Sequence, residues 1–508
     1  MENTVEPQNT KGESESIHDG GQTLSRREFT PQAAAALTGI MLLPRHLLGG
    51  PGHTAPSDKL NLAGVGVGGM GGEYLKHLES ENIVALCDVD AEKAAKTFNR
   101  YPGAKTYVDF RQMLDKQKDI DAVIIGTPDH THAAVALAAI QLRKDVYCAK
   151  PMTRTIHEAR MVVKAAREAK VATQMSVQSC ASEKACQTAE WVLAGAVGEV
   201  REVHVWTDRP VWPQGLTRPE ETHTMPPTFA WDLWLGPAPE RPYQPEYHPF
   251  RWRGWYDFGT GALGDMGCHT FHVIVQALRL EHPTRVQACS NFVMLPAYGN
   301  DADKDWMMSK KAKYPETYPA ASIVTWDFAG RGKLPPVRVH WYDGGIRPPQ
   351  PEGWPAEKEF PGDGILFHGS KGVLFSEFTG GPQIVSGARK KDFKPPRETL
   401  PRTKGHYLEF VEAAKGGAQR FVRDVHPRVA FQQRLVPRDL DAKFRVHTAF
   451  DSLEAAIGHE NFNSRKSHHP PEERRGVLSR MRVDNENAIL SFSHGREAPR
   501  TALPRRPS

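Results

Sequence analysis

A glycine-rich turn near the start of the chain is the first feature with a clear chemical use. Residues 66–71 read G-x-G-x-x-G, after an apolar stretch and before a helical one. Glycine allows a tight turn and close approach of a pyrophosphate, and the helix N-terminus offers N–H donors to phosphate oxygens. The pattern predicts a dinucleotide site with contacts from Gly66, Gly68, Gly69, Met70 and Gly71.

An acidic residue stands where a ribose contact is expected. Asp88 follows Gly66 by 22 residues and lies in a second apolar strand, expected at 83–90. Its carboxylate would accept hydrogen bonds from the adenine-ribose hydroxyls and would repel a 2′-phosphate. We therefore expect NAD as the cofactor in preference to NADP.

Two further polar segments follow expected strands. The segment T-P-D-H-T-H, residues 127–132, comes after the strand 122–127, and Ala149-Lys150-Pro151 comes after the strand 145–148. Ligands bind at the carboxyl ends of parallel strands, so both segments should face the cofactor. The expected contacts are Thr127, Pro128, His130, His132 and Lys150. For the two histidines, a capping role at the start of the next helix is favoured over contact with substrate.

A later block, G-T-G-A-L-G-D-M-G-C-H at 259–269, places an acid and an imidazole at helical spacing. Asp265 and His269 are four residues apart, so one helical turn presents both to the same cleft. His272 lies on that face too, and the three side chains would suit a metal ion. We favour a substrate contact for His272 and predict no metal.

The first part of the chain alternates strands with helices. Further helices are expected at 130–144 and 156–170, and a further strand at 172–177. Such alternation predicts a parallel, doubly wound α/β sheet.

The glycine turn, the T-P-D-H-T-H segment and the K-P pair together resemble the Gfo/Idh/MocA oxidoreductase family. The 259–269 block and W-D-L-W-L-G-P at 231–237 strengthen the likeness, and Y-H-P-F-R-W-R-G-W at 247–255 resembles a secreted branch. The resemblance implies a Rossmann domain at 59–180 and a substrate-binding α/β domain at 181–417 with a large, mostly antiparallel open sheet. Apolar–polar alternation at 201–207, 284–292, 321–327 and 337–342 agrees with such a sheet.

The resemblance also implies catalytic roles. Lys150 would orient and polarise a reacting hydroxyl, His269 would act as the base, and Asp265 would complete the group. Trp252 and His272 would contact substrate together with these three. Relatives carry Glu where this chain has Ala149, a departure that would weaken or redirect catalysis.

Tryptophans are concentrated in one region. Six of the 11 fall between Trp206 and Trp255. Aromatic faces suit a carbohydrate pocket, and packing at the domain interface is the equal alternative.

Composition excludes several classes of protein. The chain has 65 basic and 60 acidic residues, and outside residues 418–508 it is close to neutral, which leaves its domains no electrostatic footprint for nucleic acid. The basic residues at 418–508 could bind a polyanion, but a solvated tail is favoured. No run approaches the ~20 apolar residues of a membrane span. The six cysteines form no C-x-x-C pair, so no cysteine-based zinc site is expected.

The two ends of the chain differ from the rest. Residues 1–58 combine a polar start, which we expect to be disordered, with S-R-R-E-F at 25–29 and an apolar stretch at 33–43. These resemble a twin-arginine signal, which predicts recognition by that export machinery and a periplasmic or secreted protein; an amphipathic helix is the alternative. Residues 418–508 form an atypical basic tail with 15 Arg and no Trp, Tyr or Cys.

Three functions follow from these patterns. The first is an NAD-dependent oxidoreductase acting on a ring hydroxyl of a sugar, polyol or glycoside. The second is a glycoside-cleaving enzyme that keeps its NAD bound and works by oxidation and elimination. The third is a non-catalytic sugar- or nucleotide-binding protein, favoured by Ala149. A homo-oligomer formed through the open sheet is implied by the resemblance.

Overall fold

The computed structural model describes residues 58–292, 294–296, 309–311, 316–378, 380–387, 390–416 and 488–491. Every described helix and strand lies in one compact unit that begins at Leu60. The expected signal segment, and a helix that the sequence suggests at 444–457, lie outside the described residues.

The first sheet is parallel and has the strand order β3-β2-β1-β4-β5-β6. Its strands are β1 (Asn61–Val65), β2 (Asn82–Cys87), β3 (Lys105–Tyr107), β4 (Ala122–Ile125), β5 (Asp145–Cys148) and β6 (Thr173–Met175). The order reverses between β1 and β4, and a doubly wound sheet binds its ligand at the carboxyl ends of the strands beside that point. The predicted fold class of this half is confirmed.

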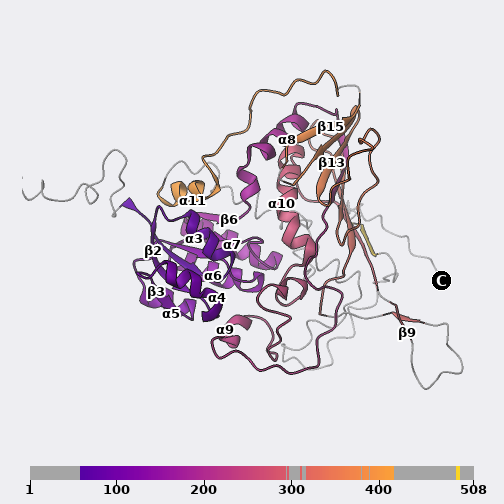
Figure 1. Cartoon of the computed structure of the whole chain (residues 1–508). Helices are drawn as coiled ribbons and strands as arrows, with labels where there is room; N and C mark the ends of the chain where they lie inside the picture. The colour runs from indigo at the N-terminus through magenta and orange to yellow at the C-terminus, as the bar shows by residue number, and fades with distance from the viewer. Residues whose placement is uncertain are drawn as a thin grey trace, which may run out of the picture. The chain divides into compact units, whose positions relative to one another are not determined.

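Helices cover both faces of this sheet (Figure 1). One face carries α3 (Met70–His77), α4 (Ala91–Arg100) and α11 (His406–Ala414), and the other carries α5 (Phe110–Lys116), α6 (Asp129–Gln141) and α7 (Ile156–Ala169). Successive strand residues therefore pack on opposite layers, and the strands read as continuous apolar runs. Although α11 comes from the stretch expected to form the second domain, its Phe410 packs on Tyr147 of β5, with 5.5 Å between ring centroids.

The second sheet has the order β15-β14-β13-β7-β12-β11-β8-β16. Its strands are β7 (Val200–Trp206), β8 (Arg285–Ser290), β11 (Ser322–Phe328), β12 (Val337–Tyr342), β13 (Gly364–Gly369), β14 (Gly372–Ser376), β15 (Pro382–Ser386) and β16 (Ala488–Ser491). Only β7 and β12 pair in parallel. The predicted large, mostly antiparallel sheet is confirmed. A separate two-stranded ladder joins β9 (Met294–Pro296) and β10 (Ser309–Lys311).

One face of this second sheet is covered and the other is not packed by a described helix. Helices α8 (Glu183–Leu193) and α10 (Gly261–Leu278) lie on the covered face, over a core that includes Val203, Trp326 and Trp341. Alternate residues of the same strands point to the opposite side. Glu202, His204 and His340 stay half-exposed there, whereas Trp206, Leu366 and Phe375 are buried in a smaller apolar cluster on that side.

Short helical turns shape the loops around these sheets. They are η2 (Gln178–Ala181), α9 (Trp231–Leu235) and η3 (Arg251–Gly254). Among the described residues, no helix has the length and apolar character needed to cross a membrane.

Candidate active site

The glycine turn lies between β1 and α3 and leaves no room for larger side chains at two positions. Gly66 has φ +75°, and a Cβ there would lie 2.6 Å from the backbone nitrogen of Thr127. A Cβ at Gly71 would collide with the carbonyl oxygen of Gly66. The turn is thus held against the loop after β4, and Gly69, where a Cβ would meet nothing within 4 Å, forms its open edge.

Asp88 lies at the carboxyl end of β2 and faces the same turn. Its Oδ2 accepts hydrogen bonds from the backbone N–H groups of Val67, at 2.7 Å, and Gly68, at 2.9 Å. Met70 opens α3 with 52% of its surface exposed. A glycine cradle, a helix N-terminus and a carboxylate at the end of the second strand are the groups that a dinucleotide needs. The residues present fit NAD.

The histidines of the T-P-D-H-T-H segment are buried. The Nε2 of His130 lies 2.8 Å from the carbonyl oxygen of Trp234, and its Nδ1 lies 3.3 Å from that of Phe258. The Nδ1 and Nε2 of His132 each lie 2.7 Å from a carbonyl oxygen, that of Pro151 and that of Thr127. Burial lowers the pKa of His132 to about 4. These contacts favour positioning roles: His132 ties the two loops that carry Thr127 and Lys150.

The chain then brings a lysine from the first half onto a carboxylate from the second. The Nζ of Lys150 lies 2.8 Å from Oδ1 of Asp265 and donates to the Asp265 carbonyl oxygen at 3.1 Å. Arg253 approaches the same Oδ1 with its Nε at 3.0 Å. The side chain of Asp265 is 8% exposed. Its buried negative charge is therefore balanced mainly by the two cations rather than by solvent.

The charge balance of this cluster sets the state of Asp265. Burial by itself would raise the pKa of the carboxyl, but the charges of Lys150 and Arg253 outweigh it and the pKa is lowered. Asp265 therefore stays ionised and fixes the ammonium group of Lys150 in one place.

His269 follows Asp265 by one turn of α10, as the spacing predicts. Its ring is packed edge-on against Phe378, with centroids 5.1 Å apart. Burial and the charge of Lys150 lower its pKa to about 3, so the imidazole is neutral at physiological pH. His272, also on α10, is half-buried one turn further on.

The tryptophan-rich segment mainly forms a core. Trp231, Trp234 and Trp255 are buried in one cluster, together with Trp252. Trp252 is 6% exposed, and its ring lies 4.3 Å from the guanidinium carbon of Arg253. Packing therefore accounts for most of these residues, and substrate contact by Trp252 stays a prediction.

Two residues of this site were missed from the sequence. Arg253 stands inside the 247–255 motif, but nothing in its spacing shows that it reaches Asp265. Asp129 is 1% exposed and accepts a hydrogen bond from the Thr260 hydroxyl at 2.7 Å. Burial and the nearby charge of Asp265 raise the pKa of Asp129 to about 7. The sequence signal that could have identified Asp129 is the presence of an acidic residue inside the T-P-D-H segment, directly after a strand.

Ala149, where the resemblance predicts Glu, is buried at the carboxyl end of β5. Ala149 continues β5 by donating its N–H to the Ile125 carbonyl at 2.8 Å. It is 8% exposed and lies in the apolar cluster that also holds Tyr147 and Phe410. A methyl group fits this surrounding without an unpaired charge.

Comparison with known proteins adds a second line of support. Residues 60–177 match the NAD-binding Rossmann-fold model of the Gfo/Idh/MocA oxidoreductase family, and residues 191–296 match the model of its C-terminal α/β domain.

Individual relatives share less of the chain. Inositol 2-dehydrogenase of Salmonella typhimurium is 34% identical over 106 residues, which are 20% of this chain and 31% of that protein. Levoglucosan dehydrogenase of Pseudarthrobacter phenanthrenivorans is 26% identical over 115 residues, 23% of this chain and 29% of that protein. The chain thus spans about a third of the length of these relatives.

Among solved structures, the WlbA dehydrogenase of Bordetella pertussis, in complex with NADH and UDP-GlcNAcA, is 17% identical. The match covers 74% of this chain and 95% of that one, with a TM-score of 0.48. The two matches show that residues 60–177 and 191–296 are similar to the two domains of Gfo/Idh/MocA oxidoreductases.

Proposed function

We propose that this protein is an NAD-dependent oxidoreductase that acts on a ring hydroxyl of a sugar, polyol or glycoside. The observation that carries the proposal is the buried contact of Lys150 with Asp265, one helical turn from His269. Inositol and levoglucosan, the substrates named for two relatives, both carry hydroxyl groups on a ring.

Each group of the site has a defined task. NAD, held by the glycine turn and Asp88, supplies the hydride acceptor. Lys150 donates a hydrogen bond to the substrate oxygen and stabilises its developing negative charge. His269, neutral at physiological pH, takes the hydroxyl proton. Asp265 holds the ammonium group of Lys150 in place, and Arg253 holds the carboxylate of Asp265.

The first test is the nucleotide released when the purified full-length chain is denatured, identified by mass spectrometry and counted per chain. NADH formation is then followed with inositols, levoglucosan and simple glycosides. Turnover of one of these with net NADH supports the proposal. A chain that releases no nucleotide and binds no added NAD contradicts it.

The glycoside-cleaving alternative keeps one cofactor through the whole cycle. It is favoured by the S-R-R-E-F segment, because a protein exported through the twin-arginine route would work where free NAD is scarce. About one NAD per chain, with glycoside cleavage and no net NADH, would establish it. Export is part of this proposal, and fractionation of cells that express the full chain and an Arg26→Lys/Arg27→Lys variant tests it.

The binding-only alternative rests on Ala149. Ala149→Glu restores the carboxylate that relatives carry there. A gain in turnover in this variant argues for a weakened enzyme. If neither chain turns over any substrate while both bind NAD, the binding function is the correct one.

A further inference from the structure

The face of the eight-stranded sheet on which no described helix packs carries a cluster of potential metal-binding side chains that the proposed reaction does not use. Glu202 and His204 lie two residues apart on β7 and so point to the same side. His340, on the parallel neighbour β12, stands directly beside His204 in the register. Among the described residues, these three are the set whose ligand atoms all lie within 4.8 Å of one another.

The donor atoms converge on one point. The Nε2 of His340 lies 3.0 Å from Oε1 of Glu202, and the Nε2 of His204 lies 3.5 Å from the same oxygen. Ligand atoms bound at ordinary zinc distances and tetrahedral angles lie about 3.3 Å apart. The two separations bracket that value, so a small shift of the carboxylate admits an ion between the three groups.

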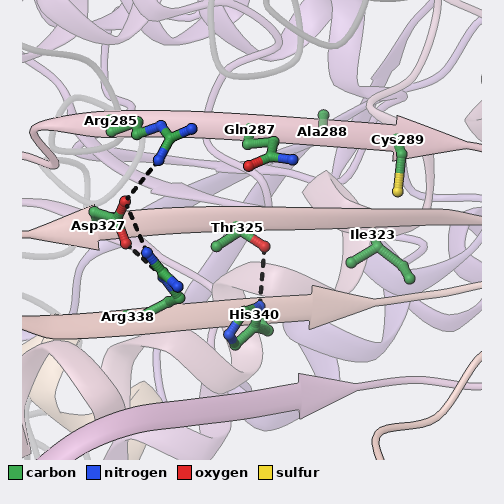
Figure 2. A pocket seen from close by; sticks show the side chains of 9 residues that line it. All are labelled: Arg285, Gln287, Ala288, Cys289, Ile323, Thr325, Asp327, Arg338 and His340. Atoms are coloured by element: carbon green, nitrogen blue, oxygen red, sulfur yellow. Dashed lines mark hydrogen bonds and ion pairs between the residues drawn. The ribbon is translucent and has the colours of Figure 1, made fainter. Parts of the chain in front are cut away.

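The Nδ1 atom of each imidazole already has a hydrogen-bond partner. The Nδ1 of His340 lies 2.9 Å from the Thr325 hydroxyl on β11, a contact visible in Figure 2. The Nδ1 of His204 lies 2.9 Å from the Tyr342 hydroxyl. A hydrogen bond at Nδ1 fixes the ring and leaves Nε2 for a metal, which is the usual outer shell of a metal-binding histidine.

The surroundings of the cluster distinguish it from the candidate active site. Val203 and Val205 alternate with these residues and pack in the core shared with α8 and α10, so the cluster lies on the opposite side of the sheet from His269. His368, on β13, pairs with Glu202 in the register, and its ring centroid lies 5.0 Å from that of His204. It stands where it can offer a fourth ligand after a rotamer change.

We propose that Glu202, His204 and His340 bind one divalent transition-metal ion, with zinc as the best match to two imidazoles and a carboxylate. The fourth position is open to water or to His368. The competing description is a hydrogen-bonded cluster without metal, in which both imidazoles donate to Glu202.

The test uses full-length protein without a histidine tag, treated with a chelator and dialysed. Zinc is titrated by calorimetry, and Co²⁺ is added separately for its visible absorption spectrum. We expect one ion per chain and the intense bands of a four-coordinate site. The paired substitution Glu202→Gln/His340→Gln, which keeps polar side chains of similar size, should weaken zinc binding at least 100-fold.

Two controls make the result specific. Cys289→Ser removes an exposed thiol from the same face of the sheet (Figure 2) and should leave the zinc affinity unchanged. Thermal unfolding and NAD binding show whether the double variant is folded. Failure of the parent chain to bind zinc, or equal affinity in a folded double variant, overturns the proposal. Loss of binding in Cys289→Ser would also overturn it, by placing the ion elsewhere. None of these outcomes depends on turnover, so they do not bear on the proposed function.

Discussion

Two polar clusters of this protein lie on opposite sides of one sheet and are built differently. In the first, the carboxylate of Asp265 is buried and held by two cations, Lys150 and Arg253. In the second, the carboxylate of Glu202 is 46% exposed and faces two imidazoles that carry no full charge unless protonated. Removing the carboxylate charge of Asp265 should leave Lys150 and Arg253 without their shared partner. In the second cluster, water can take the place of the half-exposed Glu202 carboxylate.

The largest effect is expected from Lys150→Met, which keeps the bulk of the side chain and removes its ammonium group. A positioned donor to the reacting oxygen contributes about 10²–10⁴-fold to rate. We expect turnover to fall about a thousand-fold, measured by steady-state kinetics. NAD affinity, to which Lys150 is predicted to contribute one contact, should fall only about a few-fold in a cofactor titration. The exposed Lys164→Met is the matched control. Turnover within a few-fold of the parent would remove Lys150 from the chemistry.

The next largest effect is on folding stability, and it differs between the two clusters. Asp265→Asn leaves Lys150 and Arg253 without their shared partner, and breaking a buried ion pair costs about 3–5 kcal/mol of folding free energy. Glu202→Gln, at a half-exposed position, should change stability by less than about 0.5 kcal/mol in metal-free protein. Denaturant unfolding of both variants gives the two values. If both variants lost a similar free energy of unfolding, the difference in burial between Asp265 and Glu202 would not affect stability.

A pH effect follows from Asp129, a buried carboxyl that accepts a hydrogen bond from the Thr260 hydroxyl. Its pKa rises from 3.8 in the unfolded chain to about 7 in the folded one, because burial disfavours the charge. An acid with a raised folded pKa supports the folded state at low pH, and this support disappears as the pH rises from 3.8 to about 7. Asp129→Asn should therefore flatten the decline in thermal stability over that interval.

The control for this effect is the exposed Asp115→Asn, which should keep the pH dependence of the parent chain. An Asp129→Asn curve parallel to that of the parent would show that Asp129 titrates normally. The sign is opposite to that of Asp265, whose lowered pKa gives stability that is present above 3.8 and lost only in stronger acid.

The smallest effect is expected from Trp252→Phe. The indole face lies 4.3 Å from the guanidinium carbon of Arg253, and a cation–π contact of this kind contributes about 0.5–2 kcal/mol. If Trp252 acts by orienting Arg253, the variant should lose turnover about three- to ten-fold with little change in KM. A large rise in KM with unchanged turnover would instead favour the direct substrate contact predicted from the sequence.

Much of the fold could be predicted because its signals are local. The strands β5 and β12 begin and end where the apolar pattern places them, and the glycine turn marks the β1–α3 junction. The tryptophans show the limit of such patterns: composition alone left a pocket and a core equally possible, and Trp231, Trp234 and Trp255 lie in a core.

The sequence by itself determined which residues share a helical turn or follow a strand, because these relations depend only on spacing along the backbone. It therefore identified Asp265 with His269 and the segments at the carboxyl ends of β4 and β5. Only the tertiary structure decided which distant residues meet. Glu202 and His340 are 138 residues apart, and their contact depends on β7 and β12 being neighbours in the sheet. Strand order is set by the packing of whole layers, which no local pattern encodes.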